Sequence, residues 1–313
     1  MPSYSGVWNL NAQLQARAAG NWPSPPAFGL FGGGNGASNV IDYININTTG
    51  NAADFGDLTL ARFDLGSCAS ATRGVWGGGY GTNYSNVIDY VTIASVGNAT
   101  DFGDLTTGLR YIAACSSSTR GVFGGGFSAA TTITNAMQYI TIASTGNTTA
   151  FGDLTQESGY MGACGSTTRG IFYAGTTSPY GTPSNVISYI TIASTGNAID
   201  FGDSLLSNQS LAGCSNSTRG LFGSSSSNGS LSIQYITIAS TGNAVGFGAL
   251  STVGADVAAC ASSTRGVFAG GQGAASNTIQ YVTIATTGNA VDFGDLTVGR
   301  YGFAGCSNAH GGL

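Results

Sequence analysis

Short apolar runs alternate with polar turns along almost the whole chain, in an order that repeats. In residues 112–155 a small-residue segment (IAACSSS) is followed by GVFGGG, by the alternating segment NAMQYITI and by AFGDLT. β-Branched and aromatic residues at alternate positions are typical of strands, and the Gly, Asn, Ser and Thr between them are typical of turns. The pattern predicts four short strands per unit.

The unit recurs every 46 to 50 residues, and a cysteine in each copy of the small-residue segment marks it. These cysteines are Cys68, Cys115, Cys164, Cys214, Cys260 and Cys306. Self-similarity at such a period indicates a repeat architecture, and four short antiparallel strands repeated radially form a β-propeller. We expect the small-residue strand to be innermost, because the blades crowd together at the axis.

The segments at the two ends of the chain predict how the ring closes. The second, third and fourth segments each occur six times from Phe28 onward, whereas the first occurs six times from Cys68 to Cys306. The strand around Cys306 should therefore pair beside residues 28–34 and close a six-bladed ring, which leaves no exposed edge blade. The predicted fold class is all-β, with the propeller over residues 27–313.

Two kinds of turn are nearly constant and are expected on one face of the ring. A T-R-G turn joins the first strand to the second, and a Gly-Asn pair between the third and fourth strands predicts a tight hairpin turn, because both residues tolerate positive φ. We interpret the T-R-G arginines as making blade-to-blade ion pairs, with a surface for an anion or a partner as the alternative. They are Arg73, Arg120, Arg169, Arg219 and Arg265.

Residues 1–26 lie outside the repeat. Their apolar residues, Leu10 and Leu14 among them, recur at helical spacing, and Trp8 and Trp22 flank the predicted helix. The segment is either a cap on one face of the propeller or a docking segment for another protein, since tryptophan is frequent at interfaces.

Composition excludes several classes of protein. Only 7% of residues are charged, there is no Lys, and the net charge is -5. With 42% hydrophobic residues the chain does not fit intrinsic disorder, and its dispersed arginines argue against nucleic-acid binding. No run reaches the roughly 18 apolar residues of a membrane helix, and the first residues lack the pattern of a signal peptide. We predict no membrane insertion and folding in a cytoplasm.

Few residues suit catalysis. The only histidine, His310, lies close to Leu313, where fraying is expected, so a catalytic triad is not predicted. The cysteines are predicted to be buried free thiols rather than disulfides or metal ligands, and no cofactor or metal is expected. The acids of the fourth-to-first connections, Asp64, Asp256 and Glu157, leave open a carboxylate pair for glycoside hydrolysis.

The connections from second to third strand and from fourth to first strand vary between units and should share the opposite face. Variable loops on a rigid scaffold often carry recognition, and Tyr among Ser, Gly and Asn makes an adaptable contact surface. The alternative is that these loops are unselected and that their aromatic residues only cover the blade ends. The candidate contact residues are Tyr80, Tyr84, Phe127, Tyr180, Tyr111, Tyr160 and Tyr301.

The repeat resembles the kelch family of β-propellers in three features. These are the glycine doublets such as Gly77-Gly78, the tyrosine of each third strand, and an arginine after the fourth strand at Arg62, Arg110 and Arg300. The lines YVTIASVGNATDFGDLT and STRGVFGGG, with the opening SGVWNLNAQLQARAAGNWPSPP, are similar to those of repeat-containing virion proteins of marine bacteriophages. That resemblance implies a structural or host-contact role in the tail or its fibres.

The function that these observations predict is that of a non-enzymatic virion protein, assembled in the host cytoplasm. Its variable face would contact a host surface glycan or protein, and residues 1–26 would bind other virion proteins; a homo-oligomer fits the same role. One alternative is a capsid or tail decoration protein with no host ligand. The other is a glycan-degrading depolymerase.

Overall fold

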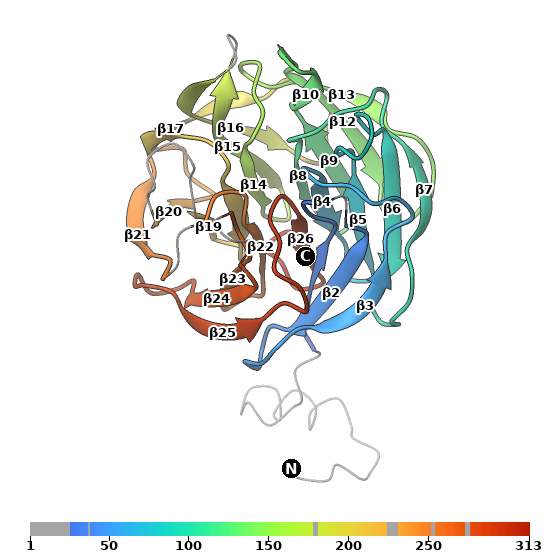
Figure 1. The fold of residues 1–313 in the computed structure, drawn as a ribbon. Helices are drawn as coiled ribbons and strands as arrows, with labels where there is room; N and C mark the ends of the chain where they lie inside the picture. Colours follow the sequence, from blue (N-terminus) through green and yellow to red (C-terminus); the bar gives the residue numbers. More distant parts are fainter. Residues whose placement is uncertain (1–25, 37, 178–180, 224–230, 252–253, 273–275) are drawn as a thin grey trace, which may run out of the picture.

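The computed structural model describes residues 26–313 except 37, 178–180, 224–230, 252–253 and 273–275. Over this part the chain is all-β and forms six four-stranded antiparallel sheets around a central axis (Figure 1). The predicted six-bladed propeller is therefore confirmed. The N-terminal candidates Trp8, Leu10, Leu14 and Trp22 lie outside the described residues.

Each blade runs from a short inner strand to an outer strand, and the inner strands of neighbouring blades contact one another around the axis. Blade 1 consists of β26 (Ala304–Ser307), β1 (Phe28–Gly32), β2 (Val40–Asn45) and β3 (Ala53–Asp57); blade 2 of β4 (Gly66–Ala69), β5 (Arg73–Gly77), β6 (Val87–Thr92) and β7 (Thr100–Asp104); and blade 3 of β8 (Ala113–Ser116), β9 (Arg120–Gly124), β12 (Ala136–Thr141) and β13 (Thr149–Asp153), with the hairpin β10 (Phe127–Ala129) and β11 (Thr132–Ile133) inserted. Blade 4 consists of β14 (Gly162–Gly165), β15 (Arg169–Thr177), β16 (Thr182–Thr191) and β17 (Ile199–Asn208); blade 5 of β18 (Ala212–Ser215), β19 (Arg219–Gly223), β20 (Ser232–Thr237) and β21 (Val245–Ala249); and blade 6 of β22 (Ala258–Ala261), β23 (Arg265–Ala269), β24 (Thr278–Thr283) and β25 (Val291–Asp295).

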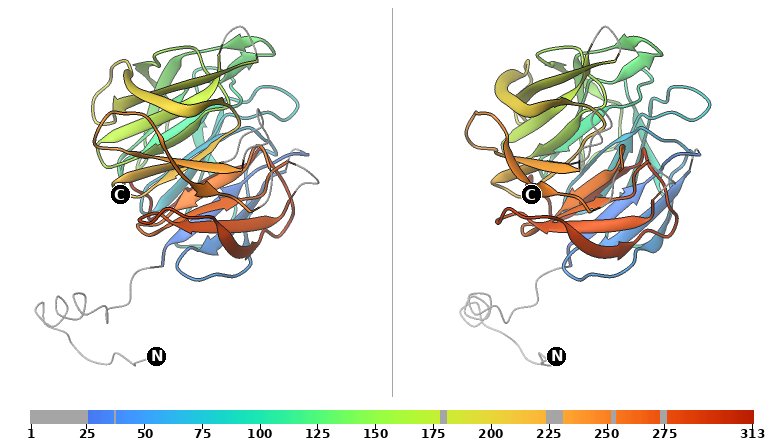
Figure 2. Two further views of the ribbon diagram at one scale, coloured as in Figure 1. Left: turned by 90° about the vertical axis from the view of Figure 1, so that its left-hand side faces the viewer. Right: turned by 60° about the vertical axis from the view of Figure 1, so that its left-hand side comes forward.

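Blade 1 joins the two ends of the repeat. Strand β26 pairs antiparallel with β1, with Cys306 opposite Leu30 and Ala304 opposite Gly32. Figure 2 shows the last strands, in red, beside the first strands, in blue. The predicted closure is confirmed, and every blade therefore has a neighbour on both sides.

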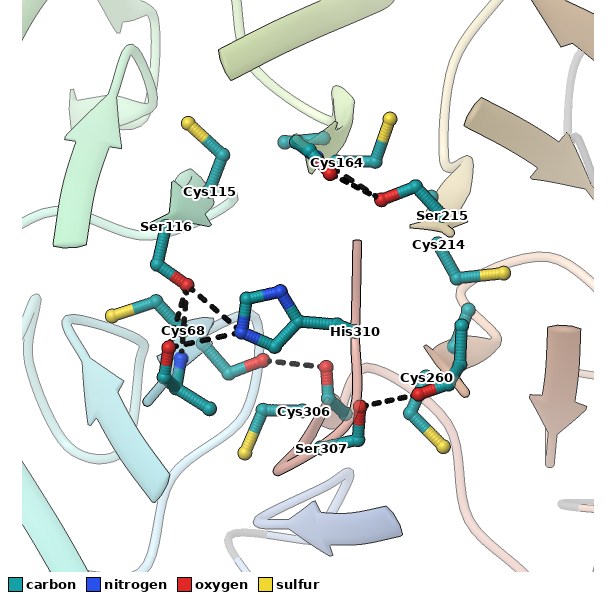
Figure 3. A pocket seen from close by; sticks show the side chains of 18 of the residues that line it. Cys68, Cys115, Ser116, Cys164, Cys214, Ser215, Cys260, Cys306, Ser307 and His310 are labelled. Carbon is teal, nitrogen blue, oxygen red and sulfur yellow. Dashed lines mark hydrogen bonds between the residues drawn. The ribbon is translucent and has the colours of Figure 1, made fainter. Parts of the chain in front are cut away.

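The cysteines hold neighbouring blades together through a contact that the sequence analysis did not predict. Figure 3 shows their sulfur atoms directed away from the centre of the axial channel. Each sulfur lies where a side chain on a glycine of the next blade would be: a Cβ on Gly121 would lie 2.5 Å from Cys68 Sγ, and one on Gly29 would lie 2.5 Å from Cys260 Sγ. The other pairs are Cys115 with Gly170, Cys164 with Gly220, Cys214 with Gly266, and Cys306 with Gly74. The inner strands are thus small because each must fit against the adjacent blade as well as around the axis.

All six thiols are expected to be unreactive in the native protein and fully reactive after unfolding. They are free and buried, and burial raises the pKa of each, to about 12 for Cys115. The thiolate is the reactive form, so a thiol that is both enclosed and neutral does not react. Titration with Ellman's reagent, with and without denaturant, checks this. Rapid native reaction, or fewer than six thiols after unfolding, would contradict it.

The T-R-G arginines link neighbouring blades, but through carbonyl groups rather than carboxylates. Arg73 Nη1 donates to the carbonyl of Ile142 at 2.8 Å, and Arg265 Nη1 donates to that of Ile46 at 2.9 Å. The Arg73 guanidinium also lies 4.6 Å from the ring centroid of Tyr90 in its own blade. The same arrangement holds for Arg120, Arg169 and Arg219. The ion-pair interpretation of these arginines is wrong, because the aspartates that end the outer strands lie at the other face.

The Gly-Asn pairs also join blades, and the prediction of a tight hairpin turn at them is wrong. In blade 1, residues 46–52 connect β2 to β3, and the chain reverses where Thr48 N donates to Asn45 O at 3.1 Å. Further along, Asn51 Oδ1 accepts a hydrogen bond from the backbone N of Asp295 in blade 6 at 3.1 Å. Equivalent asparagines bind the preceding blade around the ring: Asn98, Asn147, Asn197, Asn243 and Asn289.

The residues after β26 do not fray, in contrast to the prediction for His310. They fold over the T-R-G end of the axial channel, where Gly311 N donates to Ser215 O at 2.9 Å. His310 Nε2 donates to Ala69 O at 3.0 Å (Figure 3). Its Nδ1 accepts from Gly312 N at 3.0 Å. Burial lowers the pKa of this imidazole, so it is neutral at pH 7. His310 therefore has a structural role at this end of the channel.

Candidate ligand-binding face

The six fourth-to-first connections meet around the axis at the face opposite the T-R-G turns. Each supplies one residue with a left-handed backbone, a conformation that costs free energy for any residue other than glycine. These residues, which we call the axial ring, are Asp64 (φ 60°), Tyr111 (53°), Tyr160 (59°), Ser210 (58°), Asp256 (56°) and Gly302 (65°).

Backbone hydrogen bonds between blades hold the axial ring in this conformation. Tyr111 N donates to Asp64 O at 2.7 Å, Tyr160 N to Tyr111 O at 3.1 Å, and Ser210 N to Tyr160 O at 3.0 Å. On the other side, Gly302 N donates to Asp256 O at 2.9 Å and Asp64 N to Gly302 O at 2.6 Å. These bonds offset the backbone strain and set the side chains of different blades around one opening. Strained backbone fixed in this way is frequent at binding sites.

Two cavities open at the axial ring. One of about 80 Å³ lies at the axis between Asp64, Asp256 and the tyrosines of the ring. A larger one, of about 300 Å³, adjoins it and combines aromatic rings with amide, hydroxyl and carboxylate groups. Its lining residues are Tyr111, Tyr160, Thr176, Gly181, Gln209, Ser210, Asp256 and Gln272. Polar groups beside aromatic rings can hydrogen-bond a ligand while the rings cover its apolar surface.

The two carboxyl groups of the axial ring are close enough to affect each other's charge. Asp64 is 8% exposed, and burial, followed by the charge of Asp256, raises its pKa to about 8. Burial also raises the pKa of Asp256, whose Oδ2 accepts a hydrogen bond from Gln272 Nε2 at 2.9 Å. Asp64 Oδ2 is buried and has no hydrogen-bond partner among the residues that the structure describes. Glu157, the third acid considered for hydrolysis, is exposed and lines neither cavity.

Five of the predicted contact residues form one continuous cluster beside the larger cavity. Tyr111 and Tyr160 stack at a centroid distance of 3.4 Å, and Phe127 packs edge-on against both, at 5.6 and 5.5 Å. Tyr80 and Tyr84 pack against each other at 5.4 Å, and the guanidinium of Arg110 joins them to Tyr111. We call this set, with Arg110, the aromatic cluster.

The remaining predicted residues have different surroundings. Phe127 is fully buried, so it packs against Tyr111 and Tyr160 and does not face solvent. Tyr301 is partly exposed and makes no ring contact with the aromatic cluster within the described residues, and Tyr180 lies outside them. Four further lining residues were not predicted from the sequence: Thr176, Gln209, Ser210 and Gln272. Alignment of the fourth-to-first connections would have found Ser210, which occupies the place of Asp64 and Tyr111.

Comparison with known proteins assigns no family. No family model matches the chain, and no curated protein matches its sequence. No helix long and apolar enough to cross a membrane occurs in the described ranges. No three histidine, cysteine or acidic residues gather as metal ligands in that part of the chain either.

Proposed function

We propose that this protein is a non-enzymatic bacteriophage virion protein of the tail or its fibres, which binds a glycan of the host surface through its variable-loop face. The observation that carries the binding role is the aromatic cluster beside a cavity of about 300 Å³ lined by Gln209, Gln272 and Asp256. Aromatic rings can stack on sugars, while amide and carboxylate groups can accept and donate the hydrogen bonds that their hydroxyl groups need. Placement in a virion rests on the sequence resemblance to marine bacteriophage proteins.

The two faces of the propeller differ in a way that supports binding at the variable-loop face. The T-R-G face is built from nearly identical turns whose arginines and asparagines are used in blade-to-blade bonds. The opposite face varies between blades at equivalent places, as Asp64, Tyr111 and Ser210 show in the axial ring. Diversity on one face of a rigid scaffold favours recognition there. A decoration protein without a ligand would not need the paired tyrosines and the polar cavity.

A second candidate function is cleavage of the bound glycan. Asp64 and Asp256 lie together at the axis, and the pKa of Asp64 is raised to about 8, as a general acid requires. Release of reducing sugar from host polysaccharide, lost in Asp64→Asn and in Asp256→Asn, would identify a depolymerase. Binding without release of sugar supports the adhesin.

Purified protein is expected to reduce phage adsorption to a susceptible marine bacterium at least tenfold, and Tyr160→Ala should remove most of that effect. Loss of a central aromatic contact typically weakens binding by about 1–3 kcal/mol, or roughly 5- to 150-fold. Val96→Ser, at an exposed residue of the opposite face, is the matched control and should block adsorption like the wild type. Equal blocking by wild type and Tyr160→Ala would argue against this site. Absence of the chain from purified particles would argue against the virion assignment.

A further inference from the structure

Arg62 and Arg300 occupy the same place after an outer strand, and both are buried in ion pairs between blades. Arg62 Nη2 lies 2.9 Å from Asp89 Oδ2, and Arg300 Nη2 lies 3.1 Å from Asp42 Oδ2. All four side chains are at most 3% exposed. Each guanidinium also donates to a carbonyl of the following blade, that of Trp76 or of Phe31.

The connection from blade 2 to blade 3 differs at that place: Leu109 occupies it, with its N donating to Ser85 O as Arg62 N donates to Ser38 O, and Arg110 follows one residue later. Blade 3 also has no acid at the position of Asp42 and Asp89. Asp42 lies opposite Phe31 and Asp89 opposite Trp76 in their sheets, and the residue opposite Phe123 in blade 3 is Gln138. The amide oxygen of Gln138 accepts hydrogen bonds from Thr106 N at 2.8 Å and Thr148 Oγ1 at 2.6 Å. Among the described residues Arg110 makes no side-chain hydrogen bond and no ion pair, and it is partly exposed.

The guanidinium of Arg110 instead lies among tyrosines of the variable face. Its Cζ atom is 5.1 Å from the ring centroid of Tyr80, 5.4 Å from that of Tyr84 and 4.7 Å from that of Tyr111. The rings hold the cation in place by cation–π attraction, which does not use its N–H groups. A positioned guanidinium with unused N–H groups matches the geometry of an oxyanion, which it can bind through two parallel hydrogen bonds.

We propose that Arg110, with Tyr80, Tyr84 and Tyr111, binds the anionic group of an acidic glycan, either a carboxylate or a sulfate. This inference rests on the proposed glycan-binding function and names its ligand class. The sugar that carries the anion would lie over the aromatic cluster and extend toward the cavity of Gln209 and Gln272.

Two acids bear on the charge at this site. Asp64 interacts with Arg110, but its pKa of about 8 leaves most of its carboxyl groups protonated at pH 7. The charge of Asp256, on the other side of Gly302 in the axial ring, contributes to the raised pKa of Asp64. Asp256 lines both cavities, and Arg110 lines neither. The guanidinium therefore keeps most of its positive charge available near neutral pH. Above pH 8, ionised Asp64 would compete with the ligand, so binding should weaken there.

The test compares three polysaccharides of similar length: a polyuronate, a sulfated galactan and a neutral glucan. The wild-type protein is expected to bind at least one of the charged polymers at least tenfold more tightly than the neutral one, measured by biolayer interferometry at low salt. Arg110→Gln should remove that preference. Comparison of the polyuronate with the sulfated galactan decides between carboxylate and sulfate.

A second variant separates this role from a merely structural cation–π contact. Arg110→Lys keeps a cation beside the tyrosine rings but lacks the planar fork of N–H groups. It should bind the charged polymers more weakly than the wild type, while its unfolding temperature stays close to that of the wild type. Val96→Ser, at an exposed residue of the opposite face, is the control and should keep the preference for charged polymer. Binding by Arg110→Lys as tight as that of the wild type would contradict recognition through the guanidinium fork.

The outcomes distinguish this inference from the function on which it rests. Undiminished preference for charged polymer in Arg110→Gln, or no such preference in the wild type, overturns the acidic-glycan site. If the acidic-glycan site is overturned but Tyr160→Ala still abolishes the blocking of adsorption, the proposal of glycan recognition at this face remains. If neither polymers nor cells are bound, both proposals fall.

Discussion

Replacing Asp64 with Asn is expected to stabilise the protein at pH 9 and to flatten the dependence of its stability on pH between about 4 and 8. The folded protein holds the Asp64 proton up to a pKa of about 8, whereas the unfolded chain releases it near 3.8. The free energy of unfolding of the wild type therefore falls as pH rises through this window, because the folded state binds the extra proton. A difference of about 4 pKa units corresponds to an upper bound of about 6 kcal/mol.

The effect should be specific to the environment of Asp64. Burial and the charge of Asp256 raise its pKa, while the hydrogen bond of Tyr111 and the charge of Arg110 act in the opposite direction. Urea unfolding of wild type and Asp64→Asn at pH 5 and pH 9 measures the difference. Asp292→Asn, at an exposed carboxyl group of β25, should change stability by less than about 0.5 kcal/mol at both pH values. A pH profile of Asp64→Asn parallel to that of the wild type would refute the buried, protonated carboxyl.

Gly121→Ala is expected to destabilise the propeller by about 2–3 kcal/mol, and Cys68→Ala should restore most of that loss. The added methyl group would lie 2.5 Å from Cys68 Sγ and 3.3 Å from Ile140 Cγ1, and overpacking of a buried site typically costs about 1–3 kcal/mol. Removal of the sulfur frees the space that the methyl group needs. The two changes should therefore be strongly non-additive, with a coupling of roughly 1–3 kcal/mol.

Chemical unfolding of the wild type, both single variants and the double variant measures this coupling. Gly246→Ala is the matched control, because a Cβ there meets no atom within 4 Å and the equivalent residue of blade 3 is Ala150. It should be neutral or slightly stabilising. Additive effects of Gly121→Ala and Cys68→Ala would show that the sulfur does not fill the space beside Gly121.

The blade plan was predictable because it depends on order along the chain. Alternating segments such as NVIDYVTI predict strands from local preference, and the period of the cysteines predicts the number of units. The surplus first strand at Cys306 predicted its pairing with β1, since closure must use every strand of the repeat. The gathering of aromatic residues on one face followed from strand order alone, although the burial of Phe127 did not.

Errors arose where the partner of a residue belongs to another blade. The arginine of the T-R-G turn looked like one half of an ion pair, but its carbonyl partner in the next blade, such as Ile142 for Arg73, has no sequence signal. The Gly-Asn pair looked like a hairpin turn because that role is local, whereas Asn51 binds Asp295 across the closure of the ring. His310 looked like a frayed end because nothing near it in sequence could hold it.

The sequence by itself therefore determined the strands, the number of blades and the closure of the ring, because local preference and periodicity are properties of the chain. The tertiary structure decided which residues of different blades meet: the Cys–Gly contacts, the acid pair of Asp64 and Asp256, and Arg110 among its tyrosines. The physical reason is that the repeated sequence specifies the strands within each blade, but it does not specify how neighbouring blades are positioned relative to each other (their packing offset). That offset comes from the fit of sulfur against glycine and of turn against strand, and it places the candidate site.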